Sequence, residues 1–419
     1  MKNAVNIRIK LKVFLHYLPL LLKGEMSLRH FIAFLRRLSF FLSKMRHNKF
    51  IEFNGGIRLE FYIPTYPSRA FFTATDKFKT FGKGIKLPCA SVLMSVTSAC
   101  ACKCEYCYQR RDVGKDVDLN HLISAARSLQ DMGVAFFNIE GGEPFLRYDR
   151  LKALCDAIDD RSEIWVNSTG WGMTVERLKE LRIAAVTFSM HHPNREDFNK
   201  FMGNDEAWDH LLQGIKMCHD AGVSVTFNTC LMKEAFYNGT FEKVMDFAKE
   251  HGILMIQLIK PKPAGGWLEH KPLFSDDDLR VARGKIHTYN KDKKYAAYPA
   301  IAAQIVEEQP DVFGCTAGGT DRFYINAKGD VQPCEFLNIS FGNIAEEKFE
   351  DIYRRMRKCF EIPGECILCE QSANKIAALY SQHKLESLPL PVELSKHVYT
   401  EWDRGAATDL YKTISEIGK

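Results

Sequence analysis

The sequence contains no apolar run long enough to cross a bilayer and no signal-peptide cleavage pattern. These absences argue against a membrane-spanning or secreted class and predict a cytoplasmic protein. Most of the chain also lacks cysteine, because four of the 13 cysteines lie within residues 100–107 and five lie within residues 315–369. A secreted disulfide scaffold would be shorter and would spread its cysteines, so clustered thiols in 419 residues indicate metal or cluster ligands in a reducing compartment.

Acidic residues are nearly missing from the first 50 residues, which contain 11 Lys and Arg but only Glu25 as an acidic residue. This segment carries a net charge of +10 in a chain whose total is +5, so the other residues carry −5. Apolar side chains recur there at helical spacing, at Leu28, Phe31, Ile32, Leu35, Leu38, Leu42 and Met45. A basic amphipathic helix of this kind is typical of segments that lie in an anionic membrane interface. Alternatively, the apolar stripe packs on the rest of the protein or on a second subunit. The apolar face disfavours nucleic-acid binding.

A group of cysteines follows an apolar, β-type stretch at residues 90–97. Cys100, Cys104 and Cys107 have the spacing C-x3-C-x2-C, and Cys102 lies inside the loop. Three thiolates on one short loop can hold three irons of a [4Fe–4S] cube and leave the fourth iron without a protein ligand. Such an iron can bind a small molecule and pass it one electron. A zinc site, or a redox pair of Cys104 and Cys107, is the competing interpretation.

A Gly-Gly-Glu-Pro turn at residues 141–144 follows a short apolar strand expected at residues 136–139. Two glycines let the backbone approach a ligand closely, and an acceptor-rich turn at a strand end suits a bound ammonium group. The same four residues also form plain β-turns, so the motif is weak by itself. It gains weight because it lies one expected helix, residues 119–132, after the cysteine loop.

Strands and helices alternate after this turn, as in βα units with parallel strands. The expected strands are residues 90–97, 136–139, 163–167, 184–189, 223–228 and 254–259, and the helices that follow the third to fifth of these are residues 175–181, 208–220 and 241–251. Polar residues follow two of these strands, at Ser168-Thr169-Gly170 and at Ser189-Met190-His191-His192. These side chains can form hydrogen bonds to a ligand or only to the backbone of their own loop. For the two histidines, we expect exposed loop positions without a catalytic role rather than a role as a proton donor.

The cysteine loop, the Gly-Gly-Glu-Pro turn and the order of elements together resemble the radical S-adenosylmethionine (SAM) superfamily, over about residues 90–370. The resemblance implies an α/β fold with a partial (β/α)6 TIM-type barrel over residues 89–300. It also implies a [4Fe–4S] cluster on Cys100, Cys104 and Cys107, with SAM on its open iron. Reductive cleavage of SAM would give a 5′-deoxyadenosyl radical that abstracts hydrogen from an unactivated C–H bond. A flavodoxin or ferredoxin would supply the electron.

The same resemblance assigns roles around SAM. An aromatic residue of the cysteine loop packs near the adenine, and the Gly-Gly-Glu-Pro turn positions the methionine end. The serines at the next two strand ends contact the ribose or the carboxylate, although Ser-Met-His-His departs from the family's usual Ser-x-Asp-Gly. The residues implied to bind SAM are Tyr106, Gly141, Gly142, Glu143, Pro144, Ser168 and Ser189.

The second block of cysteines begins with a distant pair and ends with a Cys-x-x-Cys element. A Lys-Gly pair at residues 328–329 predicts a hairpin that brings Cys334 near Cys315. With Cys366 and Cys369, these thiols are enough for one fully ligated [4Fe–4S] cluster. Four thiolates hold zinc equally well, so a zinc site is the alternative.

This block resembles the SPASM/Twitch auxiliary-cluster domains of radical SAM enzymes, over residues 301–385. A Gly-Asn-Ile segment at residues 342–344 also matches them. A full SPASM domain has further cysteines, whereas this chain has none after Cys369. We therefore expect one auxiliary [4Fe–4S] cluster on Cys315, Cys334, Cys366 and Cys369, with Cys359 as a competing ligand. The cysteines expected to be small core residues are Cys89, Cys155, Cys218 and Cys230.

Substrate class is the least determined feature. The basic segment favours a membrane-associated, lipid or isoprenoid substrate and an enzyme peripheral to the inner face of the membrane. The SPASM/Twitch resemblance implies a peptide or protein side chain instead, although no peptide-recognition domain is evident ahead of the barrel. A third hypothesis is a non-catalytic iron–sulfur or zinc sensor or scaffold. The expected divisions are residues 1–50 (amphipathic segment), 51–88 (connector), 89–300 (barrel), 301–385 (auxiliary domain) and 386–419 (tail).

Overall fold

A computed structural model gives the fold of residues 2–45, 48–80, 90–270 and 274–418. The strands are β1 Ile51–Phe53, β2 Gly56–Arg58, β3 Ser91–Ser95, β4 Phe136–Glu140, β5 Glu163–Ser168, β6 Ala185–Ser189, β7 Ser224–Cys230, β8 Met255–Ile259, β9 Ala300–Ala303, β10 Tyr324–Ile325 and β11 Val331–Gln332. The α-helices are α1 Lys2–Leu22, α2 Leu28–Lys44, α3 Arg69–Thr80, α4 Leu119–Asp131, α5 Tyr148–Ala157, α6 Val175–Glu180, α7 Arg195–Met202, α8 Ala207–Ala221, α9 Thr240–Glu250, α10 Asp276–Lys291, α11 Gln304–Glu307, α12 Phe349–Cys359, α13 Leu368–Gln382, α14 Val392–Tyr399 and α15 Asp409–Glu416. Short 3-10 helices are η2 Pro144–Arg147, η3 Lys233–Phe236, η4 Gly265–Trp267 and η5 Lys293–Tyr295.

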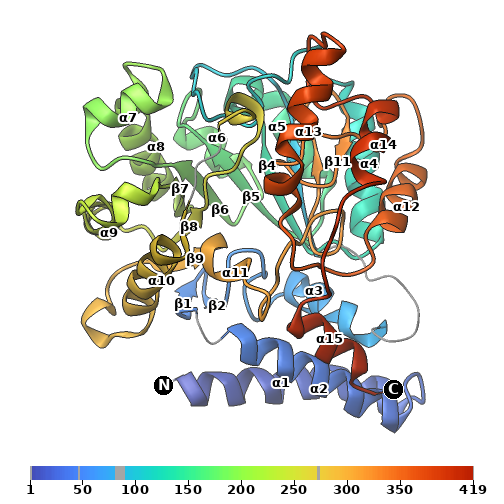
Figure 1. Ribbon diagram of the computed structural model, residues 1–419. Helices are drawn as coiled ribbons and strands as arrows, with labels where there is room; N and C mark the ends of the chain where they lie inside the picture. The colour runs from blue at the N-terminus through green and yellow to red at the C-terminus, as the bar shows by residue number, and fades with distance from the viewer. Residues whose placement is uncertain (1, 46–47, 81–89, 271–273, 419) are drawn as a thin grey trace.

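One sheet of nine strands lies at the centre of the described structure (Figure 1). Its strand order is β11-β10-β3-β4-β5-β6-β7-β8-β9. Strands β3 to β9 are parallel and follow chain order, while β10 runs parallel to β3 and antiparallel to β11. An unclosed array of parallel strands with helices along its outside is the partial TIM-type barrel that the sequence predicted.

The barrel has one more parallel strand than the six expected from the sequence. The additional strand, β9, pairs with β8 and places Ile301 beside Ile256. Its sequence, Ala-Ile-Ala-Ala, is mostly small, so it carries little of the β-branched and aromatic signal that marks a strand. β9 also lies across the domain boundary expected at residue 300, so the barrel sheet continues a few residues further along the chain.

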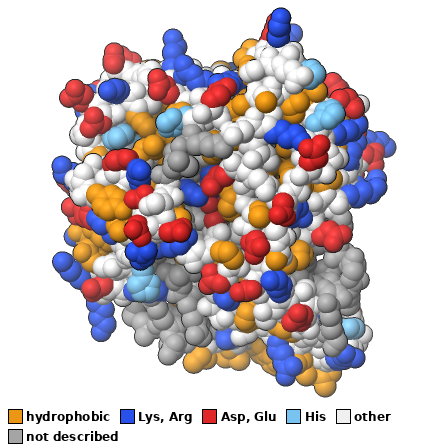
Figure 2. Space-filling model, viewed as in Figure 1, with side chains coloured by type: hydrophobic (Ala, Val, Ile, Leu, Met, Phe, Trp, Pro, Cys, Tyr) orange, Lys and Arg blue, Asp and Glu red, His pale blue; other side chains and the backbone are white. Residues whose placement is uncertain are grey.

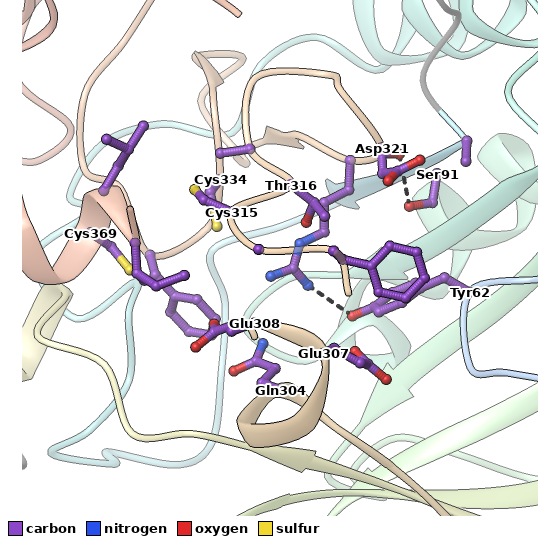
Figure 3. Close-up of a pocket in the computed structure, with 18 of the residues that line it drawn as sticks. Tyr62, Ser91, Gln304, Glu307, Glu308, Cys315, Thr316, Asp321, Cys334 and Cys369 are labelled. Atoms are coloured by element: carbon purple, nitrogen blue, oxygen red, sulfur yellow. Dashed lines mark hydrogen bonds between the residues drawn. The ribbon is translucent and has the colours of Figure 1, made fainter. Parts of the chain in front are cut away.

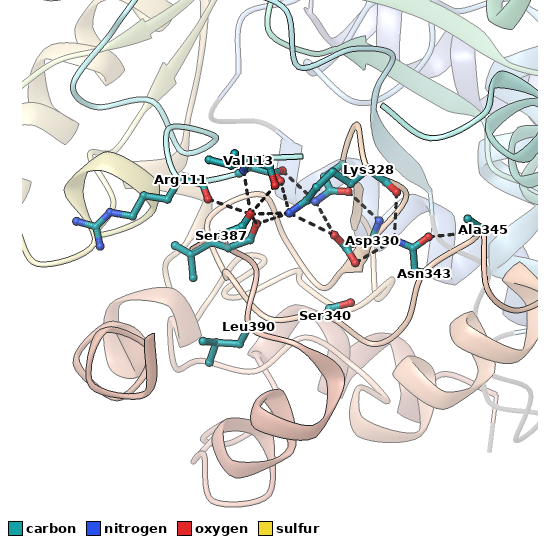
Figure 4. A network of polar contacts seen from close by, with 12 residues as sticks. Arg111, Val113, Lys328, Asp330, Ser340, Asn343, Ala345, Ser387 and Leu390 are labelled. Atoms are coloured by element: carbon teal, nitrogen blue, oxygen red, sulfur yellow. Dashed lines mark hydrogen bonds and ion pairs between the residues drawn. The ribbon is translucent and has the colours of Figure 1, made fainter. Parts of the chain in front are cut away.

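The predicted hairpin of the C-terminal part is confirmed as β10 and β11, and its turn contacts the segment after the cysteine loop (Figure 4). Lys328 Nζ donates to Ser387 Oγ at 2.7 Å and pairs with Asp112 Oδ1 at 2.8 Å. Asn343 Nδ2 donates to the Lys328 carbonyl oxygen at 3.1 Å, so the Gly-Asn-Ile segment holds the turn. These contacts fasten the auxiliary domain to the barrel beside the cysteine loop.

Aromatic residues of the N-terminal connector fill the amino end of the barrel. Phe53 stacks on Trp165 with ring centroids 5.3 Å apart, and Phe61 meets the same indole edge-on at 4.8 Å. The fully buried guanidinium of Arg58 lies 4.2 Å from the Trp165 ring and forms an ion pair with Glu163. Since this end is packed with side chains, the barrel presents its interior to ligands from the carboxyl ends of its strands.

Helices α1, α2, α3 and α15 form a layer beyond this closed end (Figure 1). Phe31 and Leu38 of the predicted stripe are buried there, whereas Leu28 and Ile32 are 60% and 42% exposed. Arg37 Nη2 donates to the Ile417 carbonyl oxygen at 2.6 Å and so joins α2 to the chain's C-terminal region. The stripe therefore packs on the protein over most of its length. No helix within the described ranges has the length and apolarity to cross a membrane.

The Arg58–Glu163 pair gives a test of this packing. Replacing Arg58 with methionine removes the cation that pairs with the Glu163 carboxylate and leaves it only the hydrogen bonds from Thr65 N and Trp165 Nε1. We therefore expect the free energy of unfolding to fall by about 3 kcal/mol. The matched control is Arg69→Met, because Arg69 pairs with nearby Asp160 while both side chains are more than 60% exposed. That change should cost less than about 1 kcal/mol. Urea unfolding followed by circular dichroism measures both, and equal losses would contradict the assignment.

Candidate active site

A cavity of about 510 Å³ lies at the carboxyl ends of the barrel strands. Its size is within the range of sites for cofactors and small substrates. We name it the reaction cavity. Its walls come from the cysteine loop, from the ends of β4 to β8, and from residues 335–336 of the auxiliary domain. Ligands of parallel α/β barrels bind at this end, because the loops that carry functional groups all start there.

All four cysteines of the cysteine loop line the reaction cavity, including the predicted ligands Cys100, Cys104 and Cys107. The Cys102 thiol hydrogen-bonds to Cys100 and to Cys104, which lowers the pKa of both. Burial instead raises the pKa of Cys107 to about 12. All three thiols of the predicted spacing therefore border the reaction cavity, where a cluster with one open iron would need them.

Two glycine turns hold the cysteine loop from opposite parts of the barrel. In the turn after β4, Gly142 N donates to the Thr97 carbonyl oxygen at 2.7 Å, and a Cβ on Gly142 would collide with Ala99. In the turn after β8, Gly266 N donates to the Cys107 carbonyl oxygen at 3.0 Å, and a Cβ there would collide with Glu105. The cysteine loop thus lies between two turns in which glycine allows the backbones to approach closely. This close fit supports the assignment of the cluster to the cysteine loop.

Gly141 and Gly142 line the reaction cavity as predicted, but Glu143 and Pro144 do not. The Glu143 carboxylate is fully buried and accepts hydrogen bonds from Ser168 Oγ at 2.9 Å and from Thr169 N at 2.6 Å. Burial raises the pKa of Glu143 even though these donors oppose the rise. The side chain therefore connects the ends of β4 and β5, and Pro144 begins helix η2 behind it, in which Pro144 and Phe145 are buried.

The wall next to the cysteine loop is aromatic. Tyr106 stacks on Phe201 with centroids 4.5 Å apart, and its hydroxyl lies 2.6 Å from His191 Nε2. His191 Nδ1 accepts from Cys230 N at 3.0 Å, so in the neutral ring Nε2 carries the proton and donates to Tyr106. Burial lowers the pKa of His191 to about 3. The expectation of an exposed loop histidine is wrong here, because His191 is 3% exposed and positions Tyr106.

Ser168 and Ser189 both line the reaction cavity, as the sequence predicted. The Ser168 hydroxyl donates its hydrogen bond to Glu143, whereas Ser189, the last residue of β6, is partly exposed. Sequence reasoning missed Glu140, which is 4% exposed at the last position of β4 and also lines the cavity. Its place directly before the glycine turn, on the inward face of a barrel strand, was the available signal.

A second cavity, the auxiliary cavity, lies beside the first and is lined by three cysteines of the C-terminal block (Figure 3). Cys315, Cys334 and Cys369 line it from three separate segments, while Cys366 and Cys359 do not reach its surface. Burial raises the pKa of Cys369 to about 12. In the part of the chain that the structure describes, no group of three or more His, Cys, Asp or Glu side chains is arranged to hold a metal ion.

Buried cations lie beside the auxiliary cysteines. Burial alone would lower the pKa of Lys262, but Glu308 and the Cys369 thiol outweigh it and raise that pKa. Arg322 behaves in the same way, raised by Glu335 and Cys334. A cluster ligated by four thiolates carries negative charge, so cations next to its ligands fit such a group.

The two cavities meet at a common wall. Four residues line both of them: Tyr62, Lys262, Gln304 and Phe336. Among these, Lys262 is held by Glu308 and Glu370 at 2.7 and 2.6 Å. The cysteine loop and the auxiliary cysteines are therefore separated by side chains of a single wall. Of the cysteines expected in the core, Cys155 and Cys218 are buried in helices and Cys230 in β7, whereas Cys89 lies outside the described residues.

Two family models match this chain: the radical SAM superfamily over residues 94–248 and an iron–sulfur cluster-binding domain over residues 315–371. The AdoMet-dependent heme synthase of Nitratidesulfovibrio vulgaris is 22% identical, over 67% of this chain and 85% of the relative. The probable GTP 3′,8-cyclase of Saccharolobus solfataricus is 24% identical, over 64% of this chain and 92% of the relative.

A solved structure shares the fold. Streptococcus suis SuiB bound to S-adenosylmethionine gives a TM-score of 0.54 at 18% identity, covering 70% of this chain and 75% of SuiB. The matched regions contain the cysteine loop, the glycine turn after β4 and all the predicted auxiliary cysteines. They imply SAM and a [4Fe–4S] cluster in the barrel and further iron–sulfur binding in the C-terminal part. These findings favour an enzyme over the hypothesis of a non-catalytic sensor or scaffold. This chain is accordingly an iron–sulfur enzyme of the radical SAM superfamily with a C-terminal auxiliary cluster-binding domain.

Proposed function

We propose that this enzyme abstracts hydrogen from an unactivated C–H bond of a substrate that it meets at an anionic membrane surface. The observation that carries the membrane part is the apolar face that α1 leaves exposed. The chemical part rests on the cysteine loop and the cavity beside it. Each part has its own test below.

The reaction cavity is suited to radical chemistry. When bound, the cluster supplies the electron that cleaves SAM to methionine and a 5′-deoxyadenosyl radical. Cys100, Cys104 and Cys107 would hold the cluster, and the backbone of Gly141 and Gly142 would receive the methionine end of SAM. The stacked rings of Tyr106 and Phe201, with Trp267 tilted against Tyr106 at 5.9 Å, shield this wall from water.

The auxiliary cavity supports one further cluster on Cys315, Cys334 and Cys369. We assign Cys366 as the fourth ligand, because Cys315 N donates to the Gly364 carbonyl oxygen at 2.8 Å, two residues before Cys366 in the chain. The wall shared by the two cavities would let this cluster accept an electron from the substrate. A flavodoxin- or ferredoxin-type protein would reduce the cluster in the barrel.

The cysteine assignment predicts the outcome of two variants. Changing Cys100, Cys104 and Cys107 together to alanine should lower bound iron from about eight to about four per chain. Such protein should form no 5′-deoxyadenosine from SAM and dithionite. Cys102→Ala is the matched control in the same loop, and we expect it to keep its iron and its SAM cleavage. Iron analysis and chromatography of the products give the result. Loss of SAM cleavage in Cys102→Ala with full retention in the triple variant would refute the assignment.

The N-terminal layer supports the membrane surface. On α1, apolar residues recur on one face and are solvent-exposed, among them Ile7 at 66%, Leu11 at 56% and Leu15 at 54%. Hydrophobic side chains gather along this edge of the molecule, at the bottom of Figure 2. Of the large hydrophobic side chains exposed in the described structure, most lie between residues 7 and 32. An apolar patch of this kind on a helix pair marks an interaction surface.

The charge of the layer favours an anionic lipid partner. Exposed basic residues flank the apolar face, at Arg8, Lys10, Lys12, Lys23, Arg29 and Arg36. Each basic side chain near an anionic surface contributes about 1 kcal/mol to binding. Phosphatidylserine-type headgroups are found on the cytoplasmic leaflet, so we place the enzyme at the inner face of the membrane as a peripheral protein.

Vesicle flotation tests this docking. We expect the wild type to float with vesicles that contain phosphatidylserine and to remain behind with phosphatidylcholine alone. The double variant Leu11→Glu/Leu15→Glu should bind at least about tenfold more weakly, because it places charge in the apolar face. Val113→Glu is the control, since Val113 is 63% exposed in a loop outside the layer. Equal flotation of all three proteins would count against membrane docking.

A peptide or protein side chain is the second candidate for the group attacked. The observation that favours it is the lining of the reaction cavity, which includes the amides of Asn138, Asn167, Asn228 and Gln257. A lipid or isoprenoid chain would place hydrocarbon against these groups without pairing them. A membrane-associated substrate with a polar reacting part satisfies both the cavity lining and the exposed face of α1.

A further inference from the structure

One corner of the reaction cavity is rich in hydrogen-bond acceptors around Glu140. The Glu140 carboxyl accepts from the Tyr108 hydroxyl and from Asn167 Nδ2, the latter at 3.1 Å. Burial is the main cause that raises the pKa of Glu140 to about 8, and the facing carboxylate of Glu335 adds to it. Both carboxyls are 4% exposed and line the cavity, Glu140 from the barrel and Glu335 from the auxiliary domain.

Two carbonyl oxygens beside these carboxyls have no hydrogen-bond partner in the described structure. They are Asn138 Oδ1 and Asn167 Oδ1, and both residues line the cavity. Asn138 is 1% exposed, so its amide is buried with one side open only to the cavity. A buried acceptor without a partner has lost its hydrogen bonds to water without compensation, and a ligand with N–H donors would supply the missing partner.

On the opposite side of this corner are hydrogen-bond donors, most of which already pair with carboxylates of the protein. Lys262 Nζ is paired with Glu308 and Glu370, and Arg322 Nη1 lies 3.4 Å from Glu335 Oε1. Gln304 Nε2 is a donor without a partner among the described residues, and Gln304 lines the far wall. The corner as a whole therefore complements a group that offers several donors and one acceptor, as an amide or an ammonium beside a carbonyl does.

We propose that this corner is a substrate subsite for a nitrogen group that donates hydrogen bonds, and that Glu140 is its specificity-determining residue. The inference rests on the proposed SAM-dependent hydrogen abstraction and adds the chemistry of the part of the substrate that enters the cavity. The subsite lies between the cysteine loop and the wall shared with the auxiliary cavity. An alkyl or isoprenoid chain there would leave the two asparagine oxygens without donors and would add none to those that Glu140 already has from Tyr108 and Asn167.

The test follows deuterium from substrate pools into 5′-deoxyadenosine. The reconstituted full-length enzyme is reduced in the presence of SAM with either a perdeuterated peptide digest or a perdeuterated lipid extract. Mass spectrometry then gives the deuterated fraction of the 5′-deoxyadenosine formed. We expect deuterium from the peptide pool. Glu140→Leu should lower that fraction about tenfold, the value of one hydrogen bond, and Glu140→Gln should lower it less.

Controls keep the result interpretable. Glu250→Leu makes the same substitution at an exposed glutamate at the end of α9 and should leave the deuterated fraction unchanged. Iron content and the change in the cluster EPR signal on adding SAM report whether Glu140→Leu is folded and binds SAM. A change in SAM affinity in Glu140→Leu would overturn the inference, because Glu140 would then serve SAM.

The remaining outcomes also decide the matter. Deuterium from the lipid pool alone, deuterium from neither pool, or a peptide-derived fraction that Glu140→Leu does not lower would each overturn the subsite while 5′-deoxyadenosine still forms. Absence of 5′-deoxyadenosine from the wild type would overturn the proposed function and the subsite with it. The two failures are therefore told apart by the same chromatogram.

Discussion

Close packing of backbone against the cysteine loop is the constraint on which the site depends. Gly142 lies against Ala99 and Gly266 against Glu105, and neither position has room for a Cβ atom. The two turns follow β4 and β8, which are separated by three strands of the same sheet. The strand register between them therefore sets the spacing of the two turns, and with it the position of the thiols. A loop site gains its precision from the rigid sheet beneath it.

The wall between the cavities shows how charge can be buried between two cluster sites. Lys262 is paired with Glu308 and Glu370, and Arg322 is paired with Glu335, so both of these cations have a carboxylate partner. Paired and hydrogen-bonded charges can stay ionised in a low-dielectric interior, whereas single ones cannot. The wall can therefore separate two cavities by a single layer of side chains and still carry full charges next to the thiols.

Local patterns made the cysteine loop and the barrel predictable, whereas roles that depend on long-range contacts could not be predicted. The spacing of Cys100, Cys104 and Cys107 is a property of one loop, and the alternation of strands and helices identified the barrel. Glu143 was expected to contact the ligand, but its carboxylate accepts a hydrogen bond from the Thr169 N–H directly after β5. A sequence does not state which of two surfaces a turn side chain faces. β9 was not predicted because its sequence, Ala-Ile-Ala-Ala, has only one of the β-branched or aromatic residues that are typical of strands. Glu140 needed the strand register to show that it points inward.

The N-terminal layer illustrates how one amphipathic pattern can serve two surfaces. The α2 stripe is largely used against α3 and α15, while α1 keeps an exposed apolar face beyond the closed end of the barrel. The auxiliary cavity reaches Phe41 of α2 and Lys77 of α3, so the same layer also borders the auxiliary cysteines. A pure hydrocarbon could pack on the exposed apolar face of the layer but could not donate hydrogen bonds to the acceptors around Glu140. A small polar molecule could donate such bonds but would make no contact with the apolar face. An amphiphilic substrate, held at the membrane and reacting through a nitrogen-bearing part, meets both demands.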